Sequence, residues 1–188
     1  MDIFIVQNNV VVPTPQALLL TPFKNIWEND SSPKKDIAMA KFSYIEFMCS
    51  YKKSNPFIGY TDKNQRKLKI LSSLPVVNAQ SVILEDSNVH DGVKLYNELQ
   101  YEASPSLRFY ESAVQASEKM IEFFENFDLM STNDRTGNPL YKPADITRAL
   151  KDTNDILKTM HSLKEKVYQE LYEDSKGKGG REINYFEK

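Results

Sequence analysis

The sequence has little of what thiol or metal chemistry needs. Its single cysteine, Cys49, cannot form an intramolecular disulfide. Because Cys49 lies in an aromatic-rich stretch with Phe47 and Tyr51, we expect it to pack as a small buried hydrophobe. The two histidines, His90 and His161, have no carboxylate or cysteine at a recognised metal spacing. We therefore expect no metal site and no cofactor.

The chain also lacks a strong charge of either sign and a long apolar run. Its 188 residues include 24 basic and 26 acidic residues, for a formal net charge of −2. Such a balance gives no global field that would attract nucleic acid or an anionic membrane. No segment approaches the ~18 apolar residues that span a bilayer, and residues 1–15 have no basic secretory signal. These features predict a soluble, intracellular protein with no membrane partner.

Motifs that carry catalytic or phosphate chemistry are missing as well. The glycines Gly177, Gly179 and Gly180 follow a predicted helix, whereas a phosphate loop places its glycines between a strand and a helix. The loop at 133–138 lacks the alternating acidic residues and the final glutamate of a calcium loop. No Gly-x-Ser-x-Gly motif or spaced acid and base pair is present. We predict a protein that is not an enzyme and has no catalytic residue.

Helical periodicity covers most of the chain. Polar and proline start signals predict a short helix that begins at Thr21-Pro22 and contains Phe23, Ile26 and Trp27. They predict further helices at 33–51, 62–74, from 87, at 105–128 and at 144–173. The β-rich runs 3–6 and 10–12 predict an N-terminal hairpin or arm, and 75–86 fits an ordered connector or two strands equally well. The predicted fold is mainly α: a helical bundle with one long C-terminal helix, an N-terminal β-arm or hairpin and an extended C-terminal tail.

The same pattern sets the expected organisation. We expect an N-terminal arm over 1–20, a helical bundle domain over 21–174, and a flexible tether with a docking peptide over 175–188. Each of the last two helices should pack through one apolar seam. The predicted seams are Leu107, Tyr110, Val114, Ser117, Ile121 and Phe124 on the first, and Ile146, Leu150, Thr153, Leu157, Met160, Leu163, Val167 and Leu171 on the second.

Both ends of the chain carry apolar residues that a short segment cannot bury alone. At the C-terminal end these are Ile183, Tyr185 and Phe186, which follow the glycine-rich tether. At the N-terminal end they are Ile3, Ile5, Val10 and Val12. Both sets are candidate partner-binding residues, because a tethered apolar peptide or an unpaired hairpin is stabilised by docking on another surface. A frayed terminus is the alternative for the C-terminal peptide.

Basic residues gather in the first third of the chain, with aromatic residues among them. They are Lys34, Lys35, Lys52, Lys53, Lys63, Arg66, Lys67 and Lys69. Basic residues interleaved with aromatics can bind nucleic acid. Lysine dominates and no recognition motif accompanies it, so a solvated helical face is the favoured interpretation.

The stretch from Asp36 to Phe57, with the helix after it, resembles connector proteins of tailed bacteriophages, particularly crAss-like phages. In that pattern an aromatic-rich helix ends in a Ser-Pro-Tyr-like turn, and the next helix carries a basic residue. Ser54, Pro56, Phe57 and Arg66 match this layout. The departures are the inserted Asn55, a phenylalanine in place of tyrosine, and lysines where an acidic residue precedes the turn. The resemblance covers residues 36–71.

The resemblance implies a head-to-tail connector adaptor, a structural virion protein that forms a homo-oligomeric ring of about twelve copies. Its implied partners are other copies of itself, the phage portal protein and the next tail or ring protein, with DNA only passing through the channel. The implied location is the connector, or neck, of the virion, with assembly in the cytoplasm of the bacterial host. Another virion or internal structural protein and a nucleic-acid-binding helical module are the alternatives.

Overall fold

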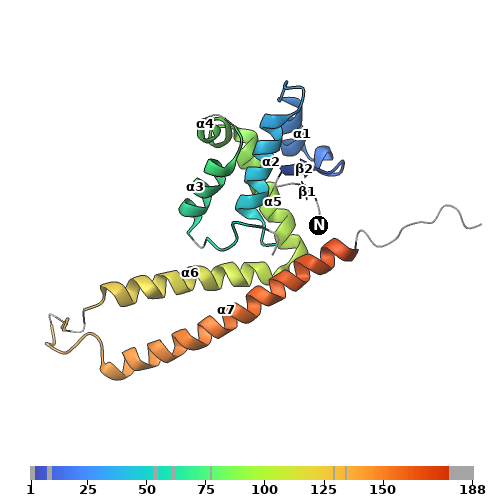
Figure 1. Cartoon of the computed structure of the whole chain (residues 1–188). Helices are drawn as coiled ribbons and strands as arrows, with labels where there is room; N and C mark the ends of the chain where they lie inside the picture. The colour runs from blue at the N-terminus through green and yellow to red at the C-terminus, as the bar shows by residue number, and fades with distance from the viewer. Residues whose placement is uncertain are drawn as a thin grey trace, which may run out of the picture. The chain divides into compact units, whose positions relative to one another are not determined.

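The computed structural model describes residues 3–7, 10–52, 55–60, 62–76, 78–128, 130–133 and 135–177. It confirms a mainly α fold with an N-terminal two-stranded hairpin and a long C-terminal helix (Figure 1). The tail after residue 177 lies outside the described residues. The elements in chain order are β1 (Phe4–Gln7), β2 (Val10–Pro13), the short 3-10 helix η1 (Ala17–Leu19), α1 (Thr21–Glu28), α2 (Asp36–Cys49), α3 (Lys63–Ser73), α4 (Ala79–Leu84), α5 (Ser87–Ala103), α6 (Pro105–Asn126) and α7 (Pro143–Gly177).

The chain divides into two compact units. The first unit contains residues 1–103 together with 168–188, and the second contains residues 104–167. In the first unit α2 and α5 run side by side, with α3 and α4 on one side and α1 with the hairpin on the other (Figure 1). The N-terminal hairpin is therefore part of the first unit's own structure.

The hairpin is stable because one of its faces joins the core. β1 and β2 pair antiparallel with Ile5 opposite Val12. Phe4 and Val11 are buried, and the backbone N–H of Val11 donates a 3.2 Å hydrogen bond to Ser43 Oγ on α2. A two-stranded hairpin is marginal in water, so its packing against a helix supplies the missing stabilisation.

The helix α2 begins three residues later than the Ser-Pro signal predicts. Lys35, the N-cap residue, has a left-handed backbone (φ 56°) and makes no side-chain capping hydrogen bond, whereas Ser32 Oγ accepts a 3.2 Å hydrogen bond from the backbone N–H of Asp36. The Asp30 carboxylate accepts 2.8 Å hydrogen bonds from the backbone N–H groups of Ser32 and Ala38. Burial opposes ionisation of Asp30, but these hydrogen bonds outweigh it and keep its pKa below the ordinary value of 3.8.

The segment 75–86 forms neither a connector nor strands, and that prediction is wrong. It folds into the short helix α4, which begins after Asn78 in a left-handed conformation (φ 57°). Ala79 and Ile83, four residues apart, are both buried. Burial at helical spacing therefore overrides the β propensity of the valines and isoleucine.

The second unit contains α6 and most of α7, joined by a loop in which Thr132 pairs with Pro139. Ser117 Oγ of α6 lies 3.0 Å from Met160 Sδ of α7, which fixes the register of the antiparallel helices. The predicted seams are only partly correct, because Ile121 is 54% exposed and Leu150 and Leu157 are 55% and 52% exposed. These side chains lie beside the helix contact and not in it.

Candidate assembly surfaces

The N-terminal candidate residues divide between core and surface. Ile3 is buried at 3% exposure and Val12 is partly buried, whereas Ile5 and Val10 are 45% and 37% exposed. The structure adds Val6, which is 41% exposed and which the sequence analysis missed. Burial alternates along β2, where Val11 and Pro13 are buried, but not from Ile3 through β1, where Ile3 and Phe4 are both buried and Ile5 and Val6 are both exposed.

One edge of this small sheet is open among the described residues. The sheet has the order β1 then β2, and α2 packs against β2 through the hydrogen bond from Val11 to Ser43. No described strand pairs with the outer edge of β1. An open edge beside exposed Ile5 and Val6 is a surface on which an extended peptide can add a strand.

The turn that carries the connector resemblance is a latch on the C-terminal end of α2. Arg66, on α3, donates from Nε to Phe47 O (3.0 Å) and from Nη2 to Ser50 O (3.1 Å). Asn55 Nδ2 donates to the same two carbonyls, at 3.0 and 2.8 Å. These donors satisfy carbonyls that the helix leaves unpaired where it ends. Of the remaining motif residues, Ser54 lies outside the described residues.

The rest of the turn is held by ring packing and a local hydrogen bond. Phe57 is partly buried, with its ring centroid 5.4 Å from that of Phe47 and 6.5 Å from that of Tyr60. Its backbone N–H donates to Asn55 Oδ1 at 3.0 Å, and Pro56 is exposed. The inserted Asn55, a departure from the connector pattern, therefore organises the turn here.

Arg66 is a structural cation and not a surface one. Its side chain is 9% exposed, and burial lowers the pKa of its guanidinium. Arginine stays protonated at neutral pH even so. A cation at the carboxyl end of α2 also interacts favourably with the helix dipole. Its two donors are used by α2, so Arg66 links α2 to α3.

Replacing Arg66 with alanine should lower the free energy of unfolding by about 2 kcal/mol, because two buried carbonyls lose a charged donor. Asn55 still donates to both carbonyls, so the variant should lose less stability than one in which both carbonyls had no hydrogen-bond donor. Urea denaturation followed by circular dichroism measures the change. Lys69→Ala, which removes an exposed basic residue from the same helix, is the control and should change stability by less than about 0.5 kcal/mol. Equal effects of the two variants would contradict the latch.

A second set of buried polar groups links α2 to α5. Tyr96 Oη donates to Glu46 Oε2 at 2.6 Å, and Gln100 Nε2 donates to Cys49 O at 3.0 Å. Burial, followed by the charge of Glu46, raises the pKa of Tyr96 well above its ordinary value. Tyr96 and Glu46 are each only 3% exposed, like the apolar residues of the core around them. These hydrogen bonds fix the packing of α2 against α5.

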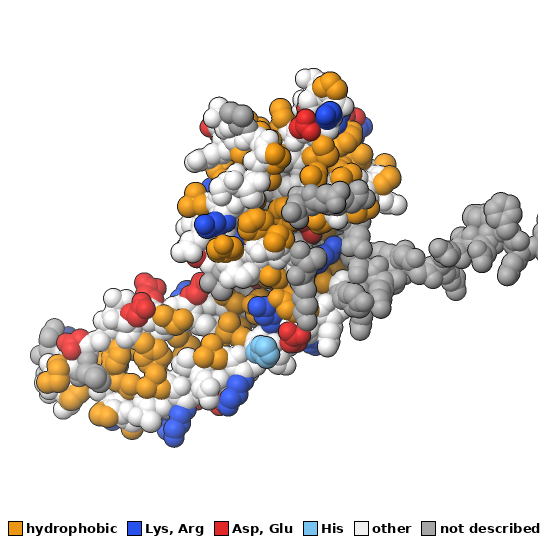
Figure 2. Space-filling model, in the orientation of Figure 1, with side chains coloured by type: hydrophobic (Ala, Val, Ile, Leu, Met, Phe, Trp, Pro, Cys, Tyr) orange, Lys and Arg blue, Asp and Glu red, His pale blue; other side chains and the backbone are white. Residues whose placement is uncertain are grey.

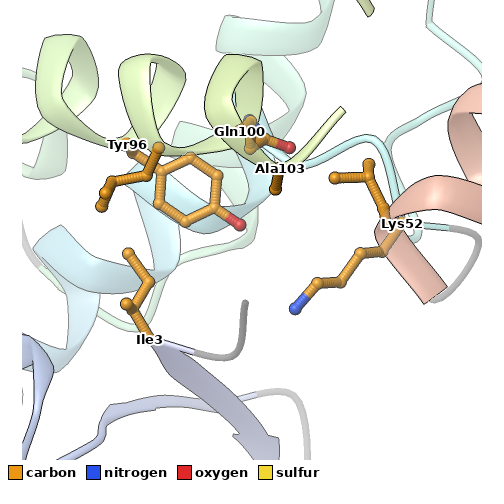
Figure 3. Close-up of a pocket in the computed structure, with 7 residues that line it drawn as sticks. Ile3, Lys52, Tyr96, Gln100 and Ala103 are labelled. Atoms are coloured by element: carbon orange, nitrogen blue, oxygen red, sulfur yellow. The ribbon is translucent and has the colours of Figure 1, made fainter. Parts of the chain in front are cut away.

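A small pocket opens beside these groups in the first unit. It is lined by Ile3, Lys52, Tyr96, Leu99, Gln100, Ala103 and Leu171 (Figure 3). Figure 3 shows Lys52 extending its ammonium group toward the space between Tyr96 and Ile3. The cavity volume is about 10 Å³, roughly the space that one water molecule needs. The pocket is therefore too small to hold a substrate.

The basic residues of the first third do not form one charged surface. Arg66 is bound to α2, and Lys35 Nζ donates to the backbone oxygens of Trp27 (3.0 Å) and Asp30. Lys63 and Lys69 are exposed and Lys67 is partly buried. The predicted solvated face therefore has fewer free cations than the sequence count suggests.

The described residues also carry no arrangement typical of metal or membrane binding. No group of three or more histidine, cysteine, aspartate or glutamate side chains in the described part of the chain is placed to hold a metal ion. None of the described helices combines the length and apolarity needed to cross a membrane.

The second unit exposes several large apolar side chains along its two helices and the loop between them. Its exposed large side chains are Phe109, Ile121, Phe123, Met130, Leu140, Leu150 and Leu157. Figure 2 shows hydrophobic side chains along the region where α6 and α7 meet. The sequence analysis assigned Ile121, Leu150 and Leu157 to internal seams and did not single out Phe109 or Phe123.

The C-terminal candidates Ile183, Tyr185 and Phe186 lie outside the described residues, so the structure does not place them. The candidate surfaces are thus the edge of β1 and the exposed faces of the second unit. Comparisons with protein-family models, with curated proteins and with solved structures give no match for this chain.

Proposed function

We propose that this chain is a structural virion protein, a head-to-tail connector adaptor that forms a ring under the portal and links the capsid to the tail. The observation that carries the proposal is the exposure of large apolar side chains on both units, at β1 and along α6 and α7. Exposed apolar side chains that gather on one face, as Figure 2 shows along α6 and α7, are typical of protein interfaces. The connector-like layout around Pro56, Phe57 and Arg66 supports the choice of connector among assembly proteins.

Each part of the chain has a role in this proposal. The first unit, with its own core, is the rigid body, and the open edge of β1 with Ile5, Val6 and Val10 meets a neighbouring chain. Ile183, Tyr185 and Phe186 anchor the C-terminal peptide on an adjacent copy, the portal or the next ring protein. DNA passes through the channel of the ring without being gripped. The protein works in the virion neck after assembly in the host cytoplasm.

The nucleic-acid-binding alternative is less well supported. Arg66, the strongest phosphate ligand among the clustered cations, donates to Phe47 O and Ser50 O instead. Among the described members of the cluster, the remaining exposed cations are Lys34, which precedes α2, and Lys63 and Lys69 on α3. A lysine-bearing helical face is typical of an ordinary solvated surface.

Mass measurement on the purified protein should give a single closed stoichiometry. Replacing Ile183, Tyr185 and Phe186 together with serine should weaken assembly on the order of 100-fold, since three apolar anchors are lost. The readout is the protein concentration at half assembly, and circular dichroism should show unchanged helical content. The matched control replaces the interleaved polar residues Glu182 and Asn184 with serine.

Two results would overturn the proposal. Monomer at every concentration, with or without a portal protein, excludes a ring adaptor, and a continuous series of masses indicates a structural protein without ring closure. DNA binding at low salt that falls steeply as salt rises would favour the nucleic-acid module instead.

A further inference from the structure

The hairpin formed by α6 and α7 has almost no interior of its own. Among the described residues between Arg108 and Lys166, only Ser117 is buried. A two-helix hairpin in water normally buries its apolar stripe against a further layer. The helices nevertheless carry apolar residues on more than one side, so surface remains that another chain can cover.

One face of the hairpin carries apolar residues from both helices. Ile121 lies four residues after Ser117 on α6, and Leu157 lies three residues before Met160 on α7. Because Ser117 and Met160 are in contact and the helices are antiparallel, Ile121 and Leu157 lie at nearly the same height. They are 54% and 52% exposed, and Leu150, two turns from Leu157, is 55% exposed.

The neighbours of this first face are acidic on α6. Glu118 and Glu125 stand three residues before and four residues after Ile121, and both are exposed. Figure 2 shows acidic side chains along α6, hydrophobic side chains between the helices and basic side chains along the outer edge of α7. The apolar strip on this face is therefore bordered by carboxylates on the α6 side and by cations on the α7 side.

The opposite flank of α6 is also apolar. Phe109, Ala116 and Phe123 recur every seven residues, and Phe109 and Phe123 are 70% and 41% exposed. The helix α6 faces α7 through Ser117 and Phe124. Phe109, Ala116 and Phe123 lie on one side of that line of contact, and Ile121 lies on the other. Lys119, exposed and four residues before Phe123, places a cation on this second face.

We propose that neighbouring copies of this chain pack hairpin against hairpin, with the Ile121, Leu150 and Leu157 face of one copy on the Phe109 and Phe123 face of the next. The two faces complement each other in charge, because Lys119 of one copy approaches the Glu118 and Glu125 border of its neighbour. A two-fold dimer would cover only one kind of face on each copy, whereas a head-to-tail contact covers both and closes into a ring. This inference rests on the ring proposed above and names the surfaces that form it.

Paired cysteines test the contact in a Cys49→Ala background, which removes the only native thiol. Leu157→Cys combined with Phe123→Cys, treated with a short bismaleimide, should give a ladder of covalent oligomers on a denaturing gel. Either cysteine alone should give monomer, since each copy then presents one reactive face. Dimers from Leu157→Cys alone would overturn the proposal in favour of a two-fold contact.

Charge substitution gives a second, independent measurement. Ile121→Asp with Leu157→Asp should raise the concentration at half assembly by at least about 100-fold, because two apolar side chains leave the contact. Ser162→Asp, an exposed change on the same helix, is the control and should assemble normally. If the wild type forms a closed ring and neither the ladder nor the charge effect appears, the ring stands and the hairpin contact is wrong. If the wild type forms no closed species, the ring itself fails and this inference fails with it.

Discussion

Replacing Phe4 with alanine should lower the free energy of unfolding by about 4 kcal/mol, a loss typical of phenylalanine truncation in a packed core. Phe4 is 3% exposed although it lies in a four-residue strand near the start of the chain. Its ring centroid lies 5.1 Å from Phe23, 5.3 Å from Phe42 and 5.7 Å from Tyr96. Truncation leaves a cavity among three rings that close packing prevents from collapsing fully. Chemical denaturation followed by circular dichroism and tyrosine fluorescence measures the loss.

The adjacent residue supplies a matched control for Phe4. Ile5 is 45% exposed on the same strand, so Ile5→Ala should cost less than about 1 kcal/mol. The two variants also separate roles, since Ile5→Ala should weaken assembly if the edge of β1 meets a partner. A Phe4→Ala variant as stable as Ile5→Ala would show that the hairpin is an arm and not part of the core.

The contrast between Phe4 and Ile5 shows what the sequence could predict at the N-terminus. The β-prone residue types identified a hairpin or arm that needs a surface to pack on. They could not identify which surface, because apolar residues bury equally well against α2 of the same chain or against another chain. The contact with Ser43, thirty-two residues away, is set by the tertiary structure.

The latch around Arg66 shows a similar limit. The resemblance singled out Arg66 and the turn, but Asn55 was counted as a departure from the pattern. Only the folded chain brings Asn55 and Arg66 to the same two carbonyls at the end of α2. A buried network of this kind depends on where α3 lies, and local periodicity does not carry that information.

The seams of α6 and α7 were mispredicted because their apolar stripes are wide. A stripe with three apolar positions in every seven residues predicts burial but does not say which two positions face the nearest helix. On α6 the structure leaves Ile121 outside the contact, and on α7 it leaves Leu150 and Leu157 outside. These exposed residues, Ile121 on α6 and Leu150 and Leu157 on α7, form the surface that a neighbouring copy is proposed to cover.

The second large effect is expected at Gly92, where α5 approaches α1 and α2 most closely. A Cβ atom on Gly92 would lie 2.9 Å from Ile45 Cδ1 and 3.2 Å from Phe23 Cε1. Both of these side chains are fully buried, so a larger residue at position 92 would have to displace core side chains. Glycine inside a helix costs ~1 kcal/mol relative to alanine, and here that cost is offset by the close approach of the helices.

Gly92→Leu should therefore lower the free energy of unfolding by about 3 kcal/mol, the upper range for overpacking a core. Gly92→Ala should lower it by about 1 kcal/mol, because the helix propensity gained from alanine partly offsets the clash with Ile45. Gly59→Ala is the control: no atom lies within 4 Å of its Cβ position, and stability should change by less than about 0.5 kcal/mol. Urea denaturation at neutral pH measures all three.

If Gly92→Ala were stabilising by the full propensity difference, Ile45 would have room to move and α5 would not be held by this contact. The expected loss of unfolding free energy is largest for Gly92→Leu, smaller for Gly92→Ala and smallest for Gly59→Ala. This order tests whether the first unit is tightly packed, as the proposed adaptor requires in order to present the edge of β1 in a fixed orientation.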